Sequence, residues 1–199
     1  MLYFIMSSRC VVGLIFALIG CLLPRATEAQ QQVFVLANDV SFTIFPSHRS
    51  YKIGERIGFV YRIRNISHAA VFVPRIVWSV ACPGITPPHV WAGLEDTSGK
   101  HYFPGYAGEC LGPTKIDVRE QMQKEAVLLK PGEVFQNSFQ LETRMFVGKL
   151  MPGEYRLEAT LYGWRDNDFT QAERATLTTF GHPFLITENP ASTTIKLAF

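Results

Sequence analysis

Residues 150–161 carry the feature that most constrains the fold, a Pro-Gly turn followed by a regularly alternating segment. Pro152 and Gly153 mark the turn. After the turn, apolar side chains occupy every second position, at Tyr155, Leu157, Ala159 and Leu161. Successive side chains of a β-strand point to opposite faces, so this period of two predicts a strand that buries one face.

The same alternation recurs along the chain and predicts an all-β domain. Residues 56–64 show it most clearly, and the Pro-Gly-Glu sequence occurs again at 131–133, where it precedes a predicted strand at 134–141. Further strands are predicted at residues 33–45, 70–73, 76–80, 90–95, 100–103, 126–129, 176–180 and 183–186, with a short edge strand or a frayed end at 192–197. Only residues 114–124 have a helical pattern. We therefore predict an antiparallel β-sandwich of seven to nine strands. Its predicted core contains Ile57, Phe59, Tyr61, Ile63, Trp78, Phe135, Phe139, Leu141, Tyr155, Leu157 and Leu161.

Two resemblances to known β-sandwich proteins make this fold prediction more specific. The segment from Leu150 to Leu157 resembles the tyrosine corner of immunoglobulin-like sandwiches, in which a tyrosine hydroxyl bonds back to the preceding turn. Residues 51–65, 129–133 and 151–157 resemble bacterial exported immunoglobulin-like modules, including the BsuPI family of intracellular proteinase inhibitors. The resemblance implies an immunoglobulin-like fold and an inhibitor activity. An ordinary hairpin strand with a half-buried Tyr155 is the alternative to the corner.

The N-terminal segment has the pattern of an export signal. Arg9 precedes an apolar run at residues 10–23, and cleavage positions follow at 27–29. We predict a signal peptide over residues 1–29 and a secreted or periplasmic protein. A retained membrane anchor is one alternative, although the run is short for a span. A lipid-anchored envelope protein is the other, because residues 18–21 resemble a lipobox in which Cys21 is acylated.

Residues 30–199 are then expected to form a single domain. The formal net charge is +2, and lysine and arginine are scattered along the chain, which argues against a nucleic-acid partner.

Cleavage of the signal peptide would leave Cys82 and Cys110 as one pair in an oxidising compartment, so a disulfide is predicted to close the insertion 82–110. Such a bond contributes about 3–4 kcal/mol in the chain-entropy model. Two unpaired thiols are the alternative.

The insertion 82–110 concentrates the aromatic side chains that are candidates for binding. A hairpin is expected within it, with a turn at residues 96–99. Its histidine and aromatic residues are His89, Trp91, His101, Tyr102, Phe103 and Tyr106. At this density they form either a small core or a recognition surface. For the recognition surface, Trp91, Tyr102 and Tyr106 are the predicted anchors for a protein or carbohydrate ligand.

No catalytic or metal motif is found in the sequence. The chain has no Gly-x-Ser-x-Gly sequence, and its histidines lack the spacing of metal ligands. The strand at 155–161 has neither the Cys nor the His of a cupredoxin, and residues 166–168 lack the later Gly and Glu of an EF-hand. We predict an exported binding module without catalytic residues, metal or cofactor. A proteinase-inhibitor-like protein is the alternative, and a pocket joining His89, His101 and Glu109 would favour an enzyme.

Overall fold

The computed structural model describes residues 33–35, 37–75, 88–104 and 117–199. The chain divides into two units, Met1–Gln31 and Gln32–Phe199, and the description concerns the second. The predicted signal segment with Cys21, the Cys82–Cys110 pair, Trp78 and Tyr106 lie outside the described residues. Within those residues, no helix has the length and apolar character needed to cross a membrane.

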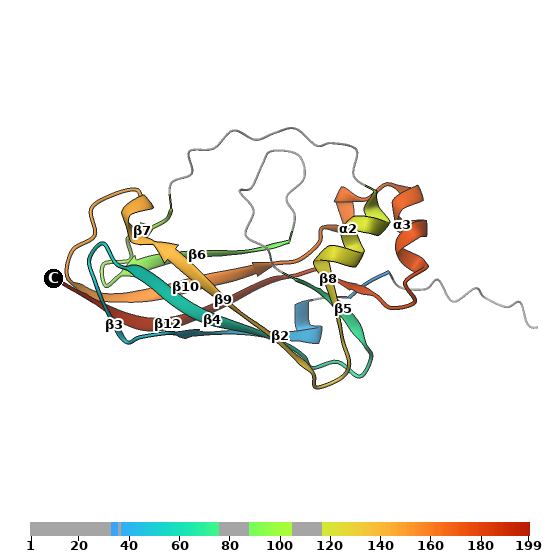
Figure 1. The fold of residues 1–199 in the computed structure, drawn as a ribbon, viewed down its shortest axis with the longest axis horizontal. Coiled ribbons are helices and arrows are strands. Elements are labelled where there is room, and N and C mark those ends of the chain that lie inside the picture. Colours follow the sequence, from blue (N-terminus) through green and yellow to red (C-terminus); the bar gives the residue numbers. More distant parts are fainter. Residues whose placement is uncertain (1–32, 36, 76–87, 105–116) are drawn as a thin grey trace, which may run out of the picture. The chain divides into compact units, whose positions relative to one another are not determined.

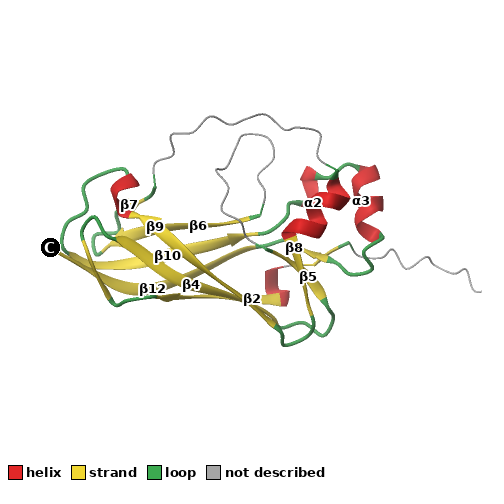
Figure 2. Cartoon of the chain, viewed as in Figure 1, coloured by secondary structure: helices red, strands yellow, loops and turns green. Residues whose placement is uncertain are grey.

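The described part of Gln32–Phe199 consists mainly of β-strands (Figures 1 and 2). The strands of four or more residues are β2 (Val40–Pro46), β4 (Arg56–Asn65), β5 (Val71–Pro74), β6 (His89–Asp96), β8 (Ala126–Leu129), β9 (Val134–Glu142), β10 (Gly153–Tyr162) and β12 (Glu188–Ala198). These eight longer strands lie within the predicted range of seven to nine, while the described residues hold twelve strands in all. Four strands of two or three residues add to them: β1 (Phe34–Val35), β3 (Ser50–Lys52), β7 (His101–Tyr102) and β11 (Phe184–Leu185).

The strands form three sheets in a β-sandwich-like arrangement, and most of their pairs are antiparallel. The largest has the order β3-β12-β10-β6-β7, the second β2-β4-β9, and the third β1-β11-β5-β8. All pairs between strands of four or more residues are antiparallel, and each parallel pair includes at least one of the short strands β1, β3 and β11. The predicted all-β, antiparallel fold class is therefore confirmed.

The main core lies between the first two sheets. The alternating residues of β4 and β10 point into it, and Ile57, Phe59 and Ile63 have no exposed surface. Of the predicted core residues in the described part, Ile57, Phe59, Tyr61, Ile63, Leu141, Tyr155, Leu157 and Leu161 are buried. Phe135 and Phe139 of the edge strand β9 are half-buried and pack against this core. Burial of these apolar faces explains the period of two in the sequence.

The C-terminal part differs from the prediction in two places. Residues 171–178 form a helix, α3 (Gln171–Thr178), where a closing β segment was expected from residue 176 onwards. A capping box between Thr170 and Glu173 starts this helix, since each side chain bonds the backbone of the other residue. The last strand, β12, is long and lies between β3 and β10, so the prediction of a short edge strand or a frayed end is wrong.

A second, smaller core lies beneath the helices. The other helix, α2 (Val118–Glu125), begins at Asp117, whose side chain accepts bonds from the N–H groups of Arg119 and Glu120, and it confirms the predicted helical pattern. Helices α2 and α3 contact each other (Figure 2). Their buried residues Met122 and Leu177 pack with Trp164 and Phe184.

Candidate functional site

The most distinctive surface of the domain is one side of the sheet formed by β6, β7 and β10. In β6 and β10 every second residue is buried, including Val90, Ala92 and Leu157, so the residues between them point to the opposite side. We call this side the outer face. Its main side chains are His89, Trp91, Glu95, His101, Phe103, Arg156, Glu158 and Tyr162.

Aromatic rings cover one part of the outer face. The ring centroids of Trp91 and Phe103 are 4.6 Å apart, and the Phe103 ring also stacks on His101 at 5.7 Å. The Phe103 ring lies over Gly93, where an added Cβ would come within 2.8 Å of Phe103 Cδ1. Phe103 is 37% exposed. A glycine at position 93 therefore permits an exposed aromatic ring to lie against the sheet.

Charged side chains cover the adjacent part of the outer face. Arg156 contacts the carboxylates of both Glu95 and Glu158, with Nη2 at 2.8 Å from Glu158 Oε1. His101 Nδ1 lies 3.3 Å from the other carboxylate oxygen of Glu158. The strand register places Arg156 directly opposite Glu95. These pairs fix both carboxylates in position beside the aromatic rings.

Three of these side chains are also suitable metal ligands. The ligand atoms of Glu95, His101 and Glu158 all lie within 4.8 Å of one another. Carboxylate oxygens and an imidazole nitrogen are ligands for divalent transition metals. A cation bound here would compete with the Arg156 guanidinium, which already contacts both carboxylates. The sequence predicted no metal site, since these ligands come from three strands and only the strand register brings them together.

The three predicted anchor residues lie in different surroundings. Trp91 is half-buried and lies on the outer face, so its role as an anchor stays a prediction. Tyr102 is only 5% exposed, its ring lies edge-on to Tyr155, and its hydroxyl donates to Asp96 Oδ2 at 3.0 Å. The prediction of Tyr102 as a ligand anchor is therefore corrected to a core role, because alternation along β7 directs it inward. Tyr106 lies outside the described residues.

Several residues of the outer face were not predicted as site residues. Arg156 and Glu158 were recognised only as parts of a strand, and Phe103 was counted in the aromatic cluster without being named as an anchor. Their outward positions follow from the alternation in the sequence, but their proximity depends on the pairing of β10 with β6 and of β6 with β7. His89 stacks on Tyr162 at 4.8 Å, whereas His101 belongs to the charged part. A pocket joining His89, His101 and Glu109, which would favour an enzyme, is not tested by the structure, because Glu109 lies outside the described residues.

No protein-family model matches the chain, and no curated protein matches it. Among solved structures, it is similar to a β-glucosidase from Erythrobacter marinus, with 15% identity and a TM-score of 0.39 over 80% of this chain and 15% of that one. It is also similar to the CARDB domain of a Pyrococcus furiosus protein in complex with di-metal ions, with 12% identity and a TM-score of 0.34 over 80% and 92% of the two chains. A third match is the DNA glycosylase AlkC from Pseudomonas fluorescens, with 11% identity and a TM-score of 0.37 over 81% and 31%. At these TM-scores the similarities support no assignment of function.

Proposed function

We propose that the protein is an exported, non-catalytic module that binds a carbohydrate chain on the outer face. The observation that carries this proposal is the combination of fixed aromatic rings with paired charges on one side of one sheet. Export is part of the proposal and is supported by the apolar N-terminal segment of the sequence.

The aromatic part is suited to the apolar faces of sugar rings. The face of an aromatic ring carries partial negative charge, which attracts the C–H groups that cover one side of a pyranose. Trp91 and Phe103 pack against each other, and Phe103 also rests on Gly93. Because the rings are already held in place, a ligand that stacks on them immobilises few additional side-chain rotamers.

The charged part is suited to hydroxyl groups. Arg156 offers several N–H donors, and the carboxylates of Glu95 and Glu158 are acceptors. Hydrogen bonds that involve a charged partner are stronger than those between neutral groups. The ion pairs hold these groups in position before a ligand arrives, so that sugar hydroxyls can bridge them without large rearrangement.

A carbohydrate fits this surface better than a folded protein partner does. Among the described residues, Phe103 is the large apolar side chain of the outer face that is exposed to solvent. A stable protein complex buries about 800 Å² on each partner around a central apolar anchor. A surface with one exposed ring, one half-buried Trp91 and several charged groups is more suited to a smaller, hydroxyl-rich ligand.

Affinity electrophoresis of the purified protein in gels that contain soluble polysaccharides tests the proposal. We expect retardation by at least one polysaccharide of a panel of β-glucans, xylans and mannans, and a reduction of about tenfold or more in affinity for Trp91→Ala and Phe103→Ala. Phe45→Ala is the matched control, because Phe45 is 44% exposed on β2, away from the outer face. The proposal fails if no polysaccharide is bound or if all three variants behave alike. Release of reducing ends from a bound polysaccharide would contradict the non-catalytic assignment.

A further inference from the structure

A pocket of about 470 Å³ lies where β10 ends. Its lining includes Tyr162, Trp164 and Arg165 from the end of β10 and the segment that follows it. Thr187 and Glu188, at the start of β12, line it from the other side. This volume is within the range typical of sites for small ligands.

Two buried polar groups of the pocket residues lack a hydrogen-bond partner in the described part of the chain. They are the indole nitrogen Nε1 of Trp164 and the hydroxyl oxygen Oγ1 of Thr187. Trp164 is 4% exposed and Thr187 is 6% exposed. Buried polar groups are satisfied in the great majority of cases, so two exceptions among the residues that line one pocket indicate a missing partner. The indole can only donate a hydrogen bond, whereas the hydroxyl can donate and accept.

The backbone explains why these two side chains belong to one pocket. Gly163 N donates to the carbonyl of Thr187 at 3.0 Å, and Trp164 N donates to the carbonyl of Leu185 at 3.2 Å. A Cβ added at Gly163 would lie 2.6 Å from the Leu185 oxygen. The segment after β10 therefore runs directly beside the segment that joins β11 to β12 because residue 163 has no side chain.

The pocket is connected to the outer face through Tyr162. Tyr162 lines the pocket, and its ring stacks on His89 at 4.8 Å. His89 lies two residues before Trp91, on the same side of β6. The register pairs His89 with Tyr162 and Trp91 with Thr160. Aromatic rings thus follow β6 and β10 from Phe103 to the pocket.

We infer that the pocket is the subsite that receives the terminal sugar unit of a carbohydrate chain lying along β6 and β10. This inference rests on the proposed carbohydrate binding. An oxygen atom of the terminal unit accepts a bond from Trp164 Nε1, and a hydroxyl of that unit bonds to Thr187 Oγ1. Both protein atoms are covered in the free domain, so binding includes a small side-chain rearrangement. Arg165 and Glu188 bring opposite charges to the lining, which favours a neutral sugar over an anionic one.

Thr187→Val tests the subsite with little risk to folding, because it replaces an unsatisfied buried hydroxyl with a methyl group of similar size. The ligands are oligosaccharides of two to six units prepared from the polysaccharide that retards the wild-type protein, and affinities are measured by titration calorimetry. We expect Thr187→Val to weaken oligosaccharide binding about five- to tenfold without lowering the melting temperature. Binding of the long polymer, which has few chain ends, should change much less. The indole N–H signal of Trp164 in NMR spectra, assigned with Trp164→Phe, should shift when the oligosaccharide is added.

The outcomes separate this inference from the proposed function. If oligosaccharide binding depends on Trp91 but neither Thr187→Val nor the Trp164 indole signal responds, the pocket is not a subsite and the outer-face proposal stands. If Thr187→Val weakens polymer and oligosaccharide equally, the pocket does not select chain ends, which also overturns the inference. If the wild-type protein binds no carbohydrate, the proposed function and the inference both fail.

Discussion

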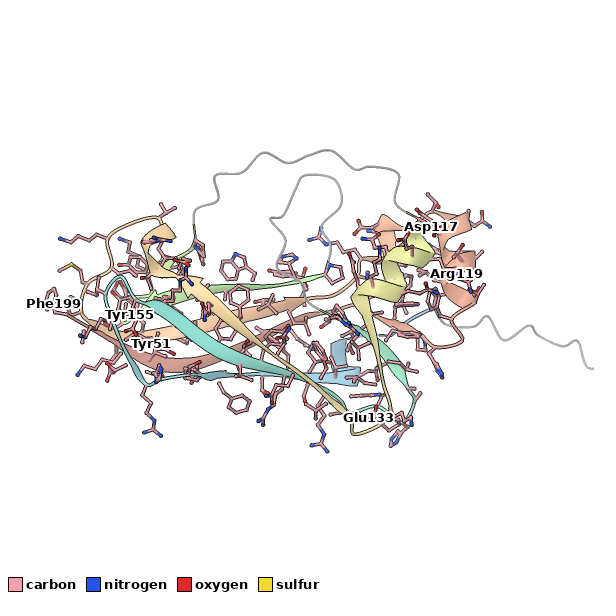
Figure 3. The ribbon with its side chains drawn as sticks, viewed as in Figure 1. Tyr51, Asp117, Arg119, Glu133, Tyr155 and Phe199 are labelled. Atoms are coloured by element: carbon pink, nitrogen blue, oxygen red, sulfur yellow. The ribbon has the colours of Figure 1, made fainter. Side chains whose placement is uncertain are left out.

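The hydroxyl of Tyr155 forms two hydrogen bonds with the backbone of Met151: it donates to the carbonyl at 2.8 Å and accepts from the N–H at 3.1 Å. Tyr155 is 4% exposed, so the bonds are shielded from water. This geometry confirms the tyrosine corner predicted from residues 150–157. Tyr51 makes a similar pair of bonds, to the carbonyl of Gly58 and from the N–H of His48. Figure 3 shows both tyrosines, and they lie on the two strands that flank β12.

Replacement of Tyr155 with phenylalanine should destabilise the domain while leaving its core packing intact. The substitution removes one hydroxyl and leaves the two Met151 backbone groups without their partner. We expect the free energy of unfolding to fall by about 1–3 kcal/mol, measured by urea denaturation. Tyr162→Phe is the control, because Tyr162 is half-buried at the surface and its variant should stay within about 0.5 kcal/mol of wild type. Equal effects of the two variants would show that the corner does not stabilise the fold.

The sequence predicted those parts of the fold that depend on local pattern. The alternation in residues 56–64 and 155–161 identified both central strands, because burial of one sheet face produces a period of two. Residues 188–198 were missed as a central strand because three of their five inward positions, Asn189, Ala191 and Thr193, are small or polar. Their place in the sheet comes from ten paired positions with β10 rather than from their own hydrophobicity.

The candidate site was less predictable than the fold. Aromatic density alone selected both Trp91 and Tyr102 as anchors, but Trp91 lies on the outer face whereas Tyr102 occupies an inward position in β7. The ion pairs of Arg156 with Glu95 and Glu158 connect strands that are far apart in sequence. Only the register of β6 with β10 reveals them, and a single sequence does not specify that register.

Asn65 is a buried polar residue that joins three segments of the chain. Its side-chain Nδ2 donates to the carbonyls of Ala69 and Leu129, both at 2.8 Å. Its Oδ1 accepts from the N–H and the hydroxyl of Ser67, at 2.9 and 2.7 Å. The side chain has no exposed surface, so the Asn-Ile-Ser sequence at 65–67 is not accessible for glycosylation in the folded domain.

Asn65→Ala should therefore be strongly destabilising. It leaves the buried carbonyl of Leu129, the carbonyl of Ala69 and the Ser67 turn without their partner, and we expect a loss of about 2–4 kcal/mol in the free energy of unfolding. Asn167→Ala provides the control at an exposed position and should change stability by less than about 0.5 kcal/mol. Thermal and urea denaturation of both variants give the comparison. A loss below about 1 kcal/mol for Asn65→Ala would contradict the role of the network.

Asp96 should make the hairpin between β6 and β7 sensitive to acid. A hydrogen bond from the Ser98 hydroxyl, with further bonds from the N–H groups of Ser98 and Lys100 and from the Tyr102 hydroxyl, lowers the pKa of Asp96 from 3.8 to about 2. The carboxylate form is therefore favoured in the folded state, and its contribution is complete above about pH 4. As the pH falls from about 4 towards 2, this contribution is lost.

Urea midpoints measured between pH 2 and pH 6 check this dependence. Asp96→Asn keeps a side-chain oxygen that can accept from Ser98 and Lys100 but cannot titrate. We expect the variant to be less stable than wild type at pH 6 and to lose less stability between pH 4 and pH 2. Parallel curves for the two proteins over that interval would show that Asp96 is not responsible for the acid sensitivity.

Gly93 is predicted to control the aromatic part of the outer face. In Gly93→Ala the new Cβ would meet the Phe103 ring at 2.8 Å and the backbone oxygen of Tyr102 at 3.0 Å. The ring can move outward more easily than the backbone can, so we expect Phe103 to leave its position beside Trp91 while the sheet is retained. Polysaccharide affinity should then fall about as much as in Phe103→Ala, with a loss of stability of about 1–3 kcal/mol. Gly153→Ala is the matched control, since the nearest atom to its added Cβ is 3.9 Å away. Unchanged affinity in Gly93→Ala would mean that the position of the Phe103 ring does not determine binding.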